Sequence, residues 1–336
     1  MTVAIVGAAA VSPLGLGWRG LSEPGHPNPA SLLDASHPGV GGFEVPALSE
    51  ALDAGDVKSR RLMSRSARFA AIAAREALRE AGWQVRADVG YWLGVGASGG
   101  PLGEIVAMLR IALEDGEVSL ARLGAEGLLA SNPLHTFQVL NNFAMCHGAI
   151  VEGTCGPNGA LYSRGAGTVH ALAEAVYAIE NGDCVRALAG GADTALHPVT
   201  WAELARDGLT AEGLVPSEGA GVLALARAHD ATAPLAIIEH VGVGDQPGAV
   251  DGADLVVIAP WGEPPRVRLR ELAGTGAGAH EVIDVTAMRG EALAATPALA
   301  WLAALDRIVA RRARRAAVLS IGPDGELGVV VLRAPS

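Results

Sequence analysis

Short apolar segments alternate with segments of helical periodicity along most of the chain. Val3–Gly7 and Tyr91–Val95 are apolar on both faces, which predicts buried strands. Arg65–Ala81 carries small apolar residues on one helical face and is followed by Gly82, which predicts a helix and its end. Thr168–Glu180 shows the same periodicity. Buried strands that alternate with helices are typical of an α/β protein, and we predict that class.

The other predicted elements continue this alternation. Further strands are expected at Ile150–Val151, Ala160–Tyr162, Arg186–Gly191, Gly219–Leu225, Pro234–Val243, Leu255–Ala259 and Val282–Val285, with a closing hairpin of Val318–Ser320 and Val329–Leu332. Further helices are expected at Ile105–Leu113, Leu120–Leu129 and Leu299–Val309. Residues 22–56 are rich in proline, glycine, serine and aspartate, which predicts mostly loop. We divide the chain into residues 1–230 and 231–336.

Composition excludes several classes of protein. Hydrophobic residues make up 50% of the 336 residues, which is enough for a large core and too much for a disordered chain. A net charge of −11 argues against nucleic-acid binding. No apolar run has the length of a membrane span and the N-terminus has no basic leader, so we expect a soluble, cytoplasmic protein. Cys146, Cys155 and Cys184 show neither a disulfide pattern nor metal-ligand spacing, and we expect no metal and no cofactor.

Three features have a functional and a structural interpretation. Gly94–Gly99 has the spacing of a dinucleotide-binding loop, but no acidic ribose partner follows, and we favour a turn that needs flexible backbone. His147 is interpreted as a hydrogen-bonded core or interface histidine. Cys155 precedes a Gly-Pro turn rather than a helix start, so it lacks the surroundings of a reactive thiolate.

Basic residues cluster at two places. The first cluster surrounds a predicted helix start, where the helix dipole disfavours positive charge, so another reason for it is expected. We call it the basic patch, and it consists of Lys58, Arg60, Arg61, Arg65 and Arg68. The second cluster lies at a helix end, which the dipole favours, and consists of Arg307, Arg311, Arg312, Arg314 and Arg315. Either cluster could dock an acidic partner.

Several segments, in order, resemble the β-ketoacyl synthases of fatty-acid and polyketide assembly. The most specific are Gly182–Asp193 and Pro216–Leu223, and the others are Val6–Gly15, Arg60–Ala70 and Gly156–Asn158. The resemblance covers nearly the whole chain and is strongest up to residue 225. It implies the thiolase fold, a layered αβαβα arrangement with two related βαβ-rich halves.

The resemblance also implies a catalytic cysteine and two histidines, and this chain has none of them. Counting from the Gly-Pro turn and from the later Ala-Gly-Gly segment puts the nucleophile at 164 or 165, and we choose Gly165. The first histidine region contains Trp261, and Glu291 stands at the second. The family's lysine falls near Thr286, and its Phe-rich gating loop corresponds to Gly322–Gly325.

These departures bear directly on chemistry. Claisen condensation needs a thiolate to hold the acyl chain and imidazoles to stabilise the charge that develops. Gly165 offers no side chain, and Glu291 would add negative charge where negative charge forms. We therefore predict that this site does not condense.

The family includes a subunit that lacks the catalytic cysteine, the chain length factor of type II polyketide systems. It pairs with a catalytic ketosynthase, and its side chains help to form the wall of that partner's acyl tunnel. The resemblance implies that partner, an acidic acyl carrier protein docked on the basic patch, and a set of tunnel or interface residues. These are Pro101, Glu104, Met108, Asn142, Phe143, Met145, His147, Leu161 and Tyr162. Two alternatives stay open: an enzyme with repurposed chemistry, such as decarboxylation or acyl transfer, and a homodimeric module that binds carrier protein.

Overall fold

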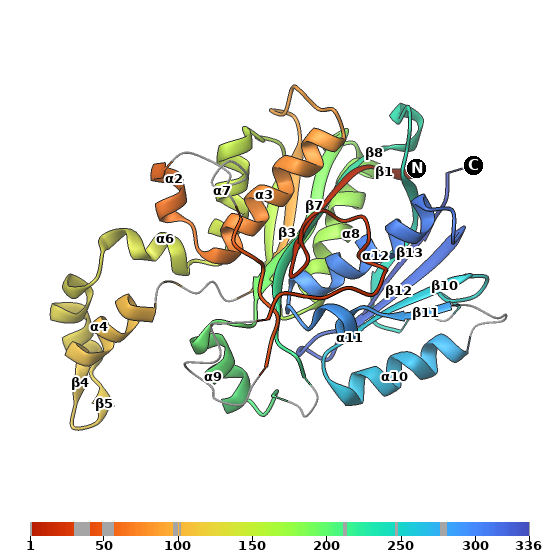
Figure 1. Ribbon diagram of the computed structural model, residues 1–336. Helices are drawn as coiled ribbons and strands as arrows, with labels where there is room; N and C mark the ends of the chain where they lie inside the picture. Colours follow the sequence, from red (N-terminus) through yellow and green to blue (C-terminus); the bar gives the residue numbers. More distant parts are fainter. Residues whose placement is uncertain are drawn as a thin grey trace.

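The computed structural model describes residues 2–29, 41–48, 57–96, 100, 102–210, 214–245, 248–275 and 281–335, and its centre is one large mixed sheet (Figure 1). The strands of that sheet are β1 (Val3–Ser12), β2 (Gly15–Leu16), β3 (Gly90–Val95), β6 (Asn158–Tyr162), β7 (Arg186–Thr194), β8 (Glu218–Arg227), β9 (Ala236–Val243), β10 (Leu255–Pro260), β11 (Glu281–Asp284), β12 (Arg315–Ile321) and β13 (Leu327–Arg333). A separate small hairpin consists of β4 (Leu113–Glu114) and β5 (Glu117–Val118).

The sheet consists of two halves with the same strand order. The first half runs β6-β3-β7-β8-β1 and the second runs β11-β10-β12-β13-β9, so both follow the order 3-2-4-5-1 along their own part of the chain. Parallel and antiparallel pairs also fall at the same places in the two halves. Strands β1 and β9 join the halves. The predicted α/β architecture with two related halves is confirmed, and residue 231 lies between β8 and β9.

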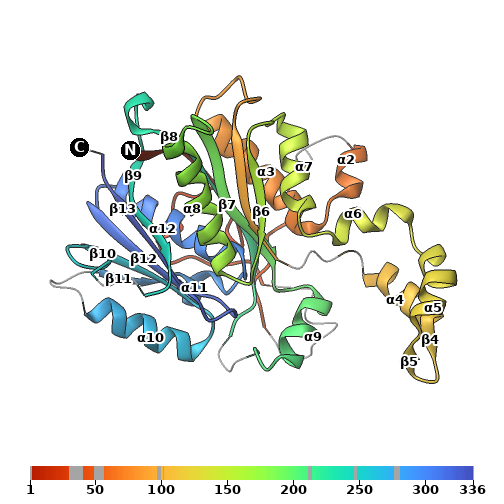
Figure 2. The ribbon, with the colours of Figure 1, turned by 180° about the vertical axis from the view of Figure 1, so that it is seen from behind.

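Helices form the other layers. They are α2 (Val57–Leu62), α3 (Arg65–Glu80), α4 (Leu102–Ala112), α5 (Leu120–Arg122), α6 (Thr136–Val139), α7 (Phe143–Glu152), α8 (Ala166–Asn181), α9 (Pro198–Arg206), α10 (Glu263–Gly274), α11 (Val285–Arg289) and α12 (Ala295–Val309). Helices α8 and α12 contact each other and strands of both halves, so they form the middle layer. Helix α3 covers the outer face of the first half and α10 covers that of the second (Figure 2).

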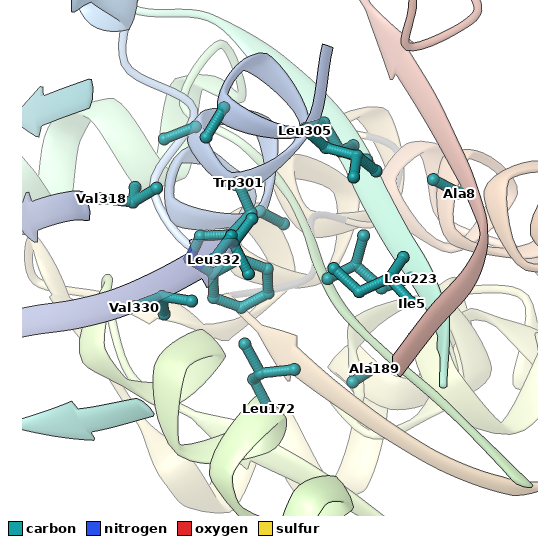
Figure 3. Packing of buried hydrophobic residues seen from close by; sticks show 14 of the residues in the cluster. Ile5, Ala8, Leu172, Ala189, Leu223, Trp301, Leu305, Val318, Val330 and Leu332 are labelled. Atoms are coloured by element: carbon teal, nitrogen blue, oxygen red, sulfur yellow. The ribbon is translucent and has the colours of Figure 1, made fainter. Parts of the chain in front are cut away.

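The middle layer is apolar on all sides because sheet lies on both sides of it. Trp301 of α12 is fully buried and lies among Leu172 of α8 and Val330 and Leu332 of β13 (Figure 3). Each half thereby contributes side chains to one shared core.

Glycines let this layer approach the strands closely. A Cβ atom at Gly94 would lie 2.5 Å from Thr168 Cα, and one at Gly96 would overlap the carboxylate of Asp193. Neither glycine has a positive φ angle. The prediction of a flexible turn at these two glycines is therefore wrong, because they serve close packing instead. Ala97–Gly99, the rest of that motif, lie outside the described residues.

Most predicted elements are present, and the exceptions have local causes. Ile150–Val151, expected as a strand, is the last turn of α7, where two β-branched residues at the helix end imitate a strand pattern. Helices α9 and α10 were not predicted, because prolines stand in the first turn of each: Pro198 begins α9, and Pro264 and Pro265 follow Glu263 in α10. No helix among the described residues is long and apolar enough to cross a membrane.

Residues 102–140, which we call the arm, extend away from the body of the molecule (Figure 1). The arm contains α4, the β4–β5 hairpin, α5 and α6. Many of its large apolar side chains are exposed, with Leu120 at 78% and Leu129 at 84%. Further exposed residues of the arm are Leu102, Leu109, Leu113, Val118, Leu128, Leu134 and Leu140. Such a concentration of exposed leucine is typical of an interaction surface.

We expect Gly221→Ala to lower the free energy of unfolding by about 1–3 kcal/mol, because overpacking a close-packed layer forces side chains and backbone apart. A Cβ atom there would lie 2.9 Å from Ala298 Cβ and 2.9 Å from Leu302 Cδ1. Urea unfolding measures the effect. The matched control is Gly274→Ala on α10, where no described atom lies within 4 Å of the added carbon. Equal stability of the two variants would contradict close packing at Gly221.

Candidate functional site

One small cavity brings together the three positions that the sequence marked as altered. Gly165 precedes α8, Trp261 follows β10 and Glu291 precedes α12, and all three line the cavity. Its volume is about 10 Å³, which is room for about one water molecule. The other lining residues are Ala259, Pro260, Leu293, Thr296, Pro297, Ser320, Gly322 and Pro323.

Gly165 is in direct backbone contact with the loop after β12. A Cβ atom at Gly165 would lie 2.7 Å from Gly322 Cα and 3.1 Å from Gly322 N. A Cβ at Gly322 would in turn lie 2.8 Å from Gly165 Cα. Real Cβ atoms do not approach backbone so closely, so any larger side chain at either position requires the two segments to separate.

The starts of the two central helices are each capped by a carboxylate from the other half of the chain. Asp324, from the second half, accepts a hydrogen bond from Ala166 N of α8 at 2.8 Å and another from the Ser163 hydroxyl. Asp193, from the first half, accepts one at 3.3 Å from the N–H of Ala294, the residue directly before α12. A helix N-terminus attracts anions, so these exchanged caps occupy two places where an external anion could bind. Burial raises the pKa of Asp193 to about 7.

Trp261 fills its part of the site with an apolar ring. It is buried with Trp201, Leu204 and Leu214 in a cluster of its own, and its indole Nε1 donates a hydrogen bond to Leu209 O at 2.9 Å. The ring therefore packs against apolar side chains and donates a hydrogen bond to a backbone carbonyl. A tryptophan indole has no basic nitrogen, so it cannot exchange a proton as an imidazole would.

Glu291 is 1% exposed and belongs to a buried polar network. Its Oε2 accepts a hydrogen bond from Val215 N at 3.0 Å, and its Oε1 lies 3.6 Å from the guanidinium of Arg266. Arg266 also binds Asp284 at 2.8 Å and donates to the Thr286 hydroxyl at 3.3 Å. Burial raises the pKa of Glu291 to about 7, which outweighs the opposing effect of Arg266.

The sequence did not identify several members of this site. Arg266 lies on α10, which was not predicted, and Asp324 belongs to a Gly-Pro-Asp-Gly sequence that is also typical of an ordinary turn. Only the pairing of distant segments shows their roles. No group of three or more His, Cys, Asp or Glu side chains that could hold a metal ion occurs within the described ranges.

The sequence profile described as "Beta-ketoacyl synthase, N-terminal domain" matches residues 29–231. The chain belongs to the β-ketoacyl synthase family. The 3-oxoacyl-[acyl-carrier-protein] synthase 2 of Staphylococcus aureus is 26% identical to it over 235 residues, which is 62% of this chain and 53% of the relative. The chain thus spans about half the length of the curated relatives that it matches.

Solved ketosynthases share the fold over the full chain. The ishigamide ketosynthase/chain length factor has a TM-score of 0.79 at 16% identity, with 100% of this chain and 99% of that chain covered. A ketosynthase in complex with its type II polyketide acyl carrier protein, AntDE:AntF, has a TM-score of 0.77 at 13% identity, with 99% of each chain covered. At such identities the agreement establishes the thiolase-like fold.

Within this β-ketoacyl synthase fold, the basic patch divides into two parts. Arg65 donates to the fully buried Glu218 from Nε at 2.7 Å and from Nη2 at 2.5 Å. Glu218 also accepts hydrogen bonds from Val45 N and the Thr194 hydroxyl, so it ties α3 to β7 and β8. The fold therefore gives a structural reason for the charge of Arg65, while its assignment to a docking surface stays a prediction. Lys58, Arg61 and Arg68 are exposed, Arg65 keeps 41% of its side chain exposed while it binds Glu218, and Arg60 is half-buried.

The second basic cluster is largely paired inside the protein. Arg307 pairs with Glu23 and Glu281, and Arg315 pairs with Glu239 at 2.6 Å. Arg312 also pairs with Glu23. These pairs favour a structural role over docking.

The predicted tunnel or interface residues fall on the arm, on α7 and on β6. Glu104 accepts a hydrogen bond from Asn132 N at 2.9 Å, and Met108 is half-buried on α4. Asn142 precedes α7, which carries Phe143, Met145 and His147, while Leu161 and Tyr162 lie on β6, the last strand of the sheet. Pro101 lies outside the described residues.

The histidine and cysteine that were considered as possible reactive groups lie apart from the cavity. His147 is buried, its ring packs 5.4 Å from Phe143, and burial lowers its pKa. Cys155 is exposed in the loop before β6. Neither lines the cavity that holds Gly165.

We expect Glu291→Gln to stabilise the protein more at pH 8 than at pH 5. Because burial raises the pKa of Glu291 from 4.5 to about 7, the folded state keeps its proton where the unfolded state has lost it. The contribution of Glu291 to stability is thus complete below about pH 4.5 and is lost as the pH rises through about 7.

A glutamine is neutral at both pH values and still accepts from Val215 N, so the variant should gain about 1–3 kcal/mol over wild type at pH 8. Urea unfolding at both pH values measures this difference. The exposed Glu326→Gln is the control. If Glu291→Gln differs from wild type in unfolding free energy by the same amount at pH 5 and pH 8, the pKa of Glu291 is not raised.

Proposed function

We propose that this chain is a non-catalytic subunit, similar to a chain length factor, that pairs with an active ketosynthase and helps to shape its acyl tunnel. The observation that carries the proposal is the backbone contact between Gly165 and Gly322. At the position that the resemblance assigns to the family's nucleophile, there is neither a side chain nor space for one. The pair would act in type II polyketide or fatty-acid-like biosynthesis.

The surroundings of Gly165 support the same conclusion. An oxyanion needs hydrogen-bond donors directed at it, and Ala166 N at the start of α8 is already bound to Asp324. Trp261 and Glu291 supply no imidazole, and the cavity between them holds about one water molecule. The small cavity also counts against repurposed decarboxylation or acyl transfer, because an acyl thioester has no room there.

The sheet edge and the arm support a dimer. Strand β6 ends the sheet with a free edge in the described part of the chain, and Tyr162 is 54% exposed there. An edge strand can pair with the equivalent strand of a partner across a two-fold axis. We propose that β6 lies at this axis and that the arm packs on the partner, which would cover its exposed leucines. The ketosynthase/chain length factor neighbour supports a catalytic partner over a second copy.

We further propose that Lys58, Arg61 and Arg68 recruit an acyl carrier protein. They are exposed on or near α2 and the start of α3, in a chain whose net charge is −11. The ketosynthase neighbour in complex with an acyl carrier protein supports a partner of this kind. The carrier would serve the catalytic partner, because the cavity of this chain is too small for its cargo.

We expect the purified protein to gain no acyl group from acyl-loaded carrier protein, and we expect the same of the Gly165→Cys variant. A cysteine at 165 would collide with Gly322, and the nearby Asp324 carboxylate disfavours a thiolate at the start of α8. Intact-protein mass spectrometry measures the adduct. An active ketosynthase is the positive control, and Cys155→Ala tests whether the exposed native thiol carries any adduct that forms. A stable adduct on wild type that one cysteine substitution abolishes would overturn the proposal.

We expect Met108→Ala to lengthen the product of the reconstituted pair and Met108→Trp to shorten it. Met108 lies on α4 of the arm, and a flexible side chain there can form an adjustable tunnel wall. Mass spectrometry of the products measures chain length. Val267→Ala, at an exposed position of α10 outside the arm, is the control. Unchanged products from both variants in an intact pair would place Met108 outside the tunnel.

A further inference from the structure

Helix α2, which carries Lys58 and Arg61 of the basic patch, is only six residues long. An isolated helix shorter than about 12 residues is marginal in water, and the last carbonyl groups of any helix have no partner inside it. In α2, a side chain from another element binds one of these carbonyls: Arg68 Nη2 of α3 donates to Arg60 O at 3.0 Å. The place of α2 on the molecule therefore depends on donors from outside the helix.

Two further side chains that bind α2 come from segments that we assign to the partner interface. Gln138 Nε2, on α6 of the arm, donates to Arg61 O at 2.7 Å. The ring of His147, on α7, forms a hydrogen bond with the backbone of Leu62. The other ring nitrogen, Nε2, is buried and has no partner among the described residues, so the bond to Leu62 fixes the ring. The last three residues of α2 thus each bind a side chain from a different helix.

A row of aromatic rings gives a second connection between the arm and α2. Phe137 of α6 meets Phe143 of α7 edge to face, with ring centroids 4.9 Å apart and planes at 89°. Phe143 in turn lies 5.4 Å from the ring of His147, which binds Leu62. Edge-to-face pairs at such distances are favourable. A shift of the arm relative to α2 would therefore break a hydrogen bond or separate two rings.

We propose that Gln138 and His147 are positioning residues, which hold α2 so that Lys58 and Arg61 are in place for an acyl carrier protein. A catalytic partner that packs on the arm would steady both side chains and thereby order the basic patch. A surface that is ordered beforehand loses less freedom on binding, which is the source of the gain in affinity. The identity of the carrier and of the partner rests on the proposed function.

The first test is hydrogen exchange of the purified full-length chain at pH 8. Gln138→Met keeps an unbranched neutral side chain and removes the donor to Arg61, while His147→Phe keeps a ring beside Phe143 and removes the bond to Leu62. We expect the two changes together to speed exchange in α2 by at least about threefold, while α3 and α7 keep their protection. Gln84→Met, the same substitution at an exposed position outside the arm and the basic patch, is the matched control.

The second test measures the affinity of the same proteins for a holo acyl carrier protein of a type II polyketide system. We expect the double variant to bind it about three- to tenfold more weakly at low salt, with a loss that shrinks as salt rises. A role in stability alone would leave the affinity of the folded protein unchanged. Addition of an active ketosynthase should slow exchange in α2 of wild type and leave α2 of the double variant unchanged.

The possible results separate this inference from the proposed function. Wild-type exchange in α2 of a folded double variant would show that Gln138 and His147 do not hold the helix, and the inference would be wrong. Faster exchange in α2 with unchanged carrier affinity would also overturn it, because the order of α2 would then have no effect on docking. A wild-type chain that binds no carrier contradicts the proposed docking itself, and this result is seen before any variant is compared.

Discussion

The structure depends on two carboxylates that the halves of the chain exchange. Helices α8 and α12 begin at the buried residues Ala166 and Ala295, where an uncapped helix start would leave donors unbonded. Asp324 caps α8 and Asp193 caps α12, each from the opposite half. Two helix starts that lie close together favour negative charge between them, and two of the chain's own carboxyl groups lie there.

Close packing is the second condition for this arrangement. The middle layer lies between two sheet halves, so its contacts are made by backbone and small side chains. The composition follows from this need, with 44 glycines and only 4% aromatic residues. The pairs Gly94–Thr168 and Gly221–Ala298 illustrate it on opposite helices of the layer. Small residues bring the helices near the strands, and the exchanged caps then stabilise their starts.

Local pattern predicted the α/β class, most strands and the two long central helices, because buried strands and amphipathic or apolar helices have distinct periodicities. The resemblance also indicated Gly165, Trp261 and Glu291, which line one cavity in the structure. The partners of these residues could not be predicted. Arg266 reaches the site only through tertiary pairing, and the resemblance that assigned Gly322–Gly325 to the gating loop gave no sign that Asp324 caps α8. The ion pair of Arg65 with Glu218 could not be predicted for the same reason, since Glu218 lies 153 positions away.

The contact between the two glycines at the cavity ties two distant segments together. Any residue larger than glycine at 165 or 322 requires the loop after β12 to move away from the start of α8. The same movement would carry Asp324 away from Ala166 N and release the cap on α8. The spacing between the two halves at this point is therefore set by backbone contact, and a side chain added on one side displaces a hydrogen bond on the other.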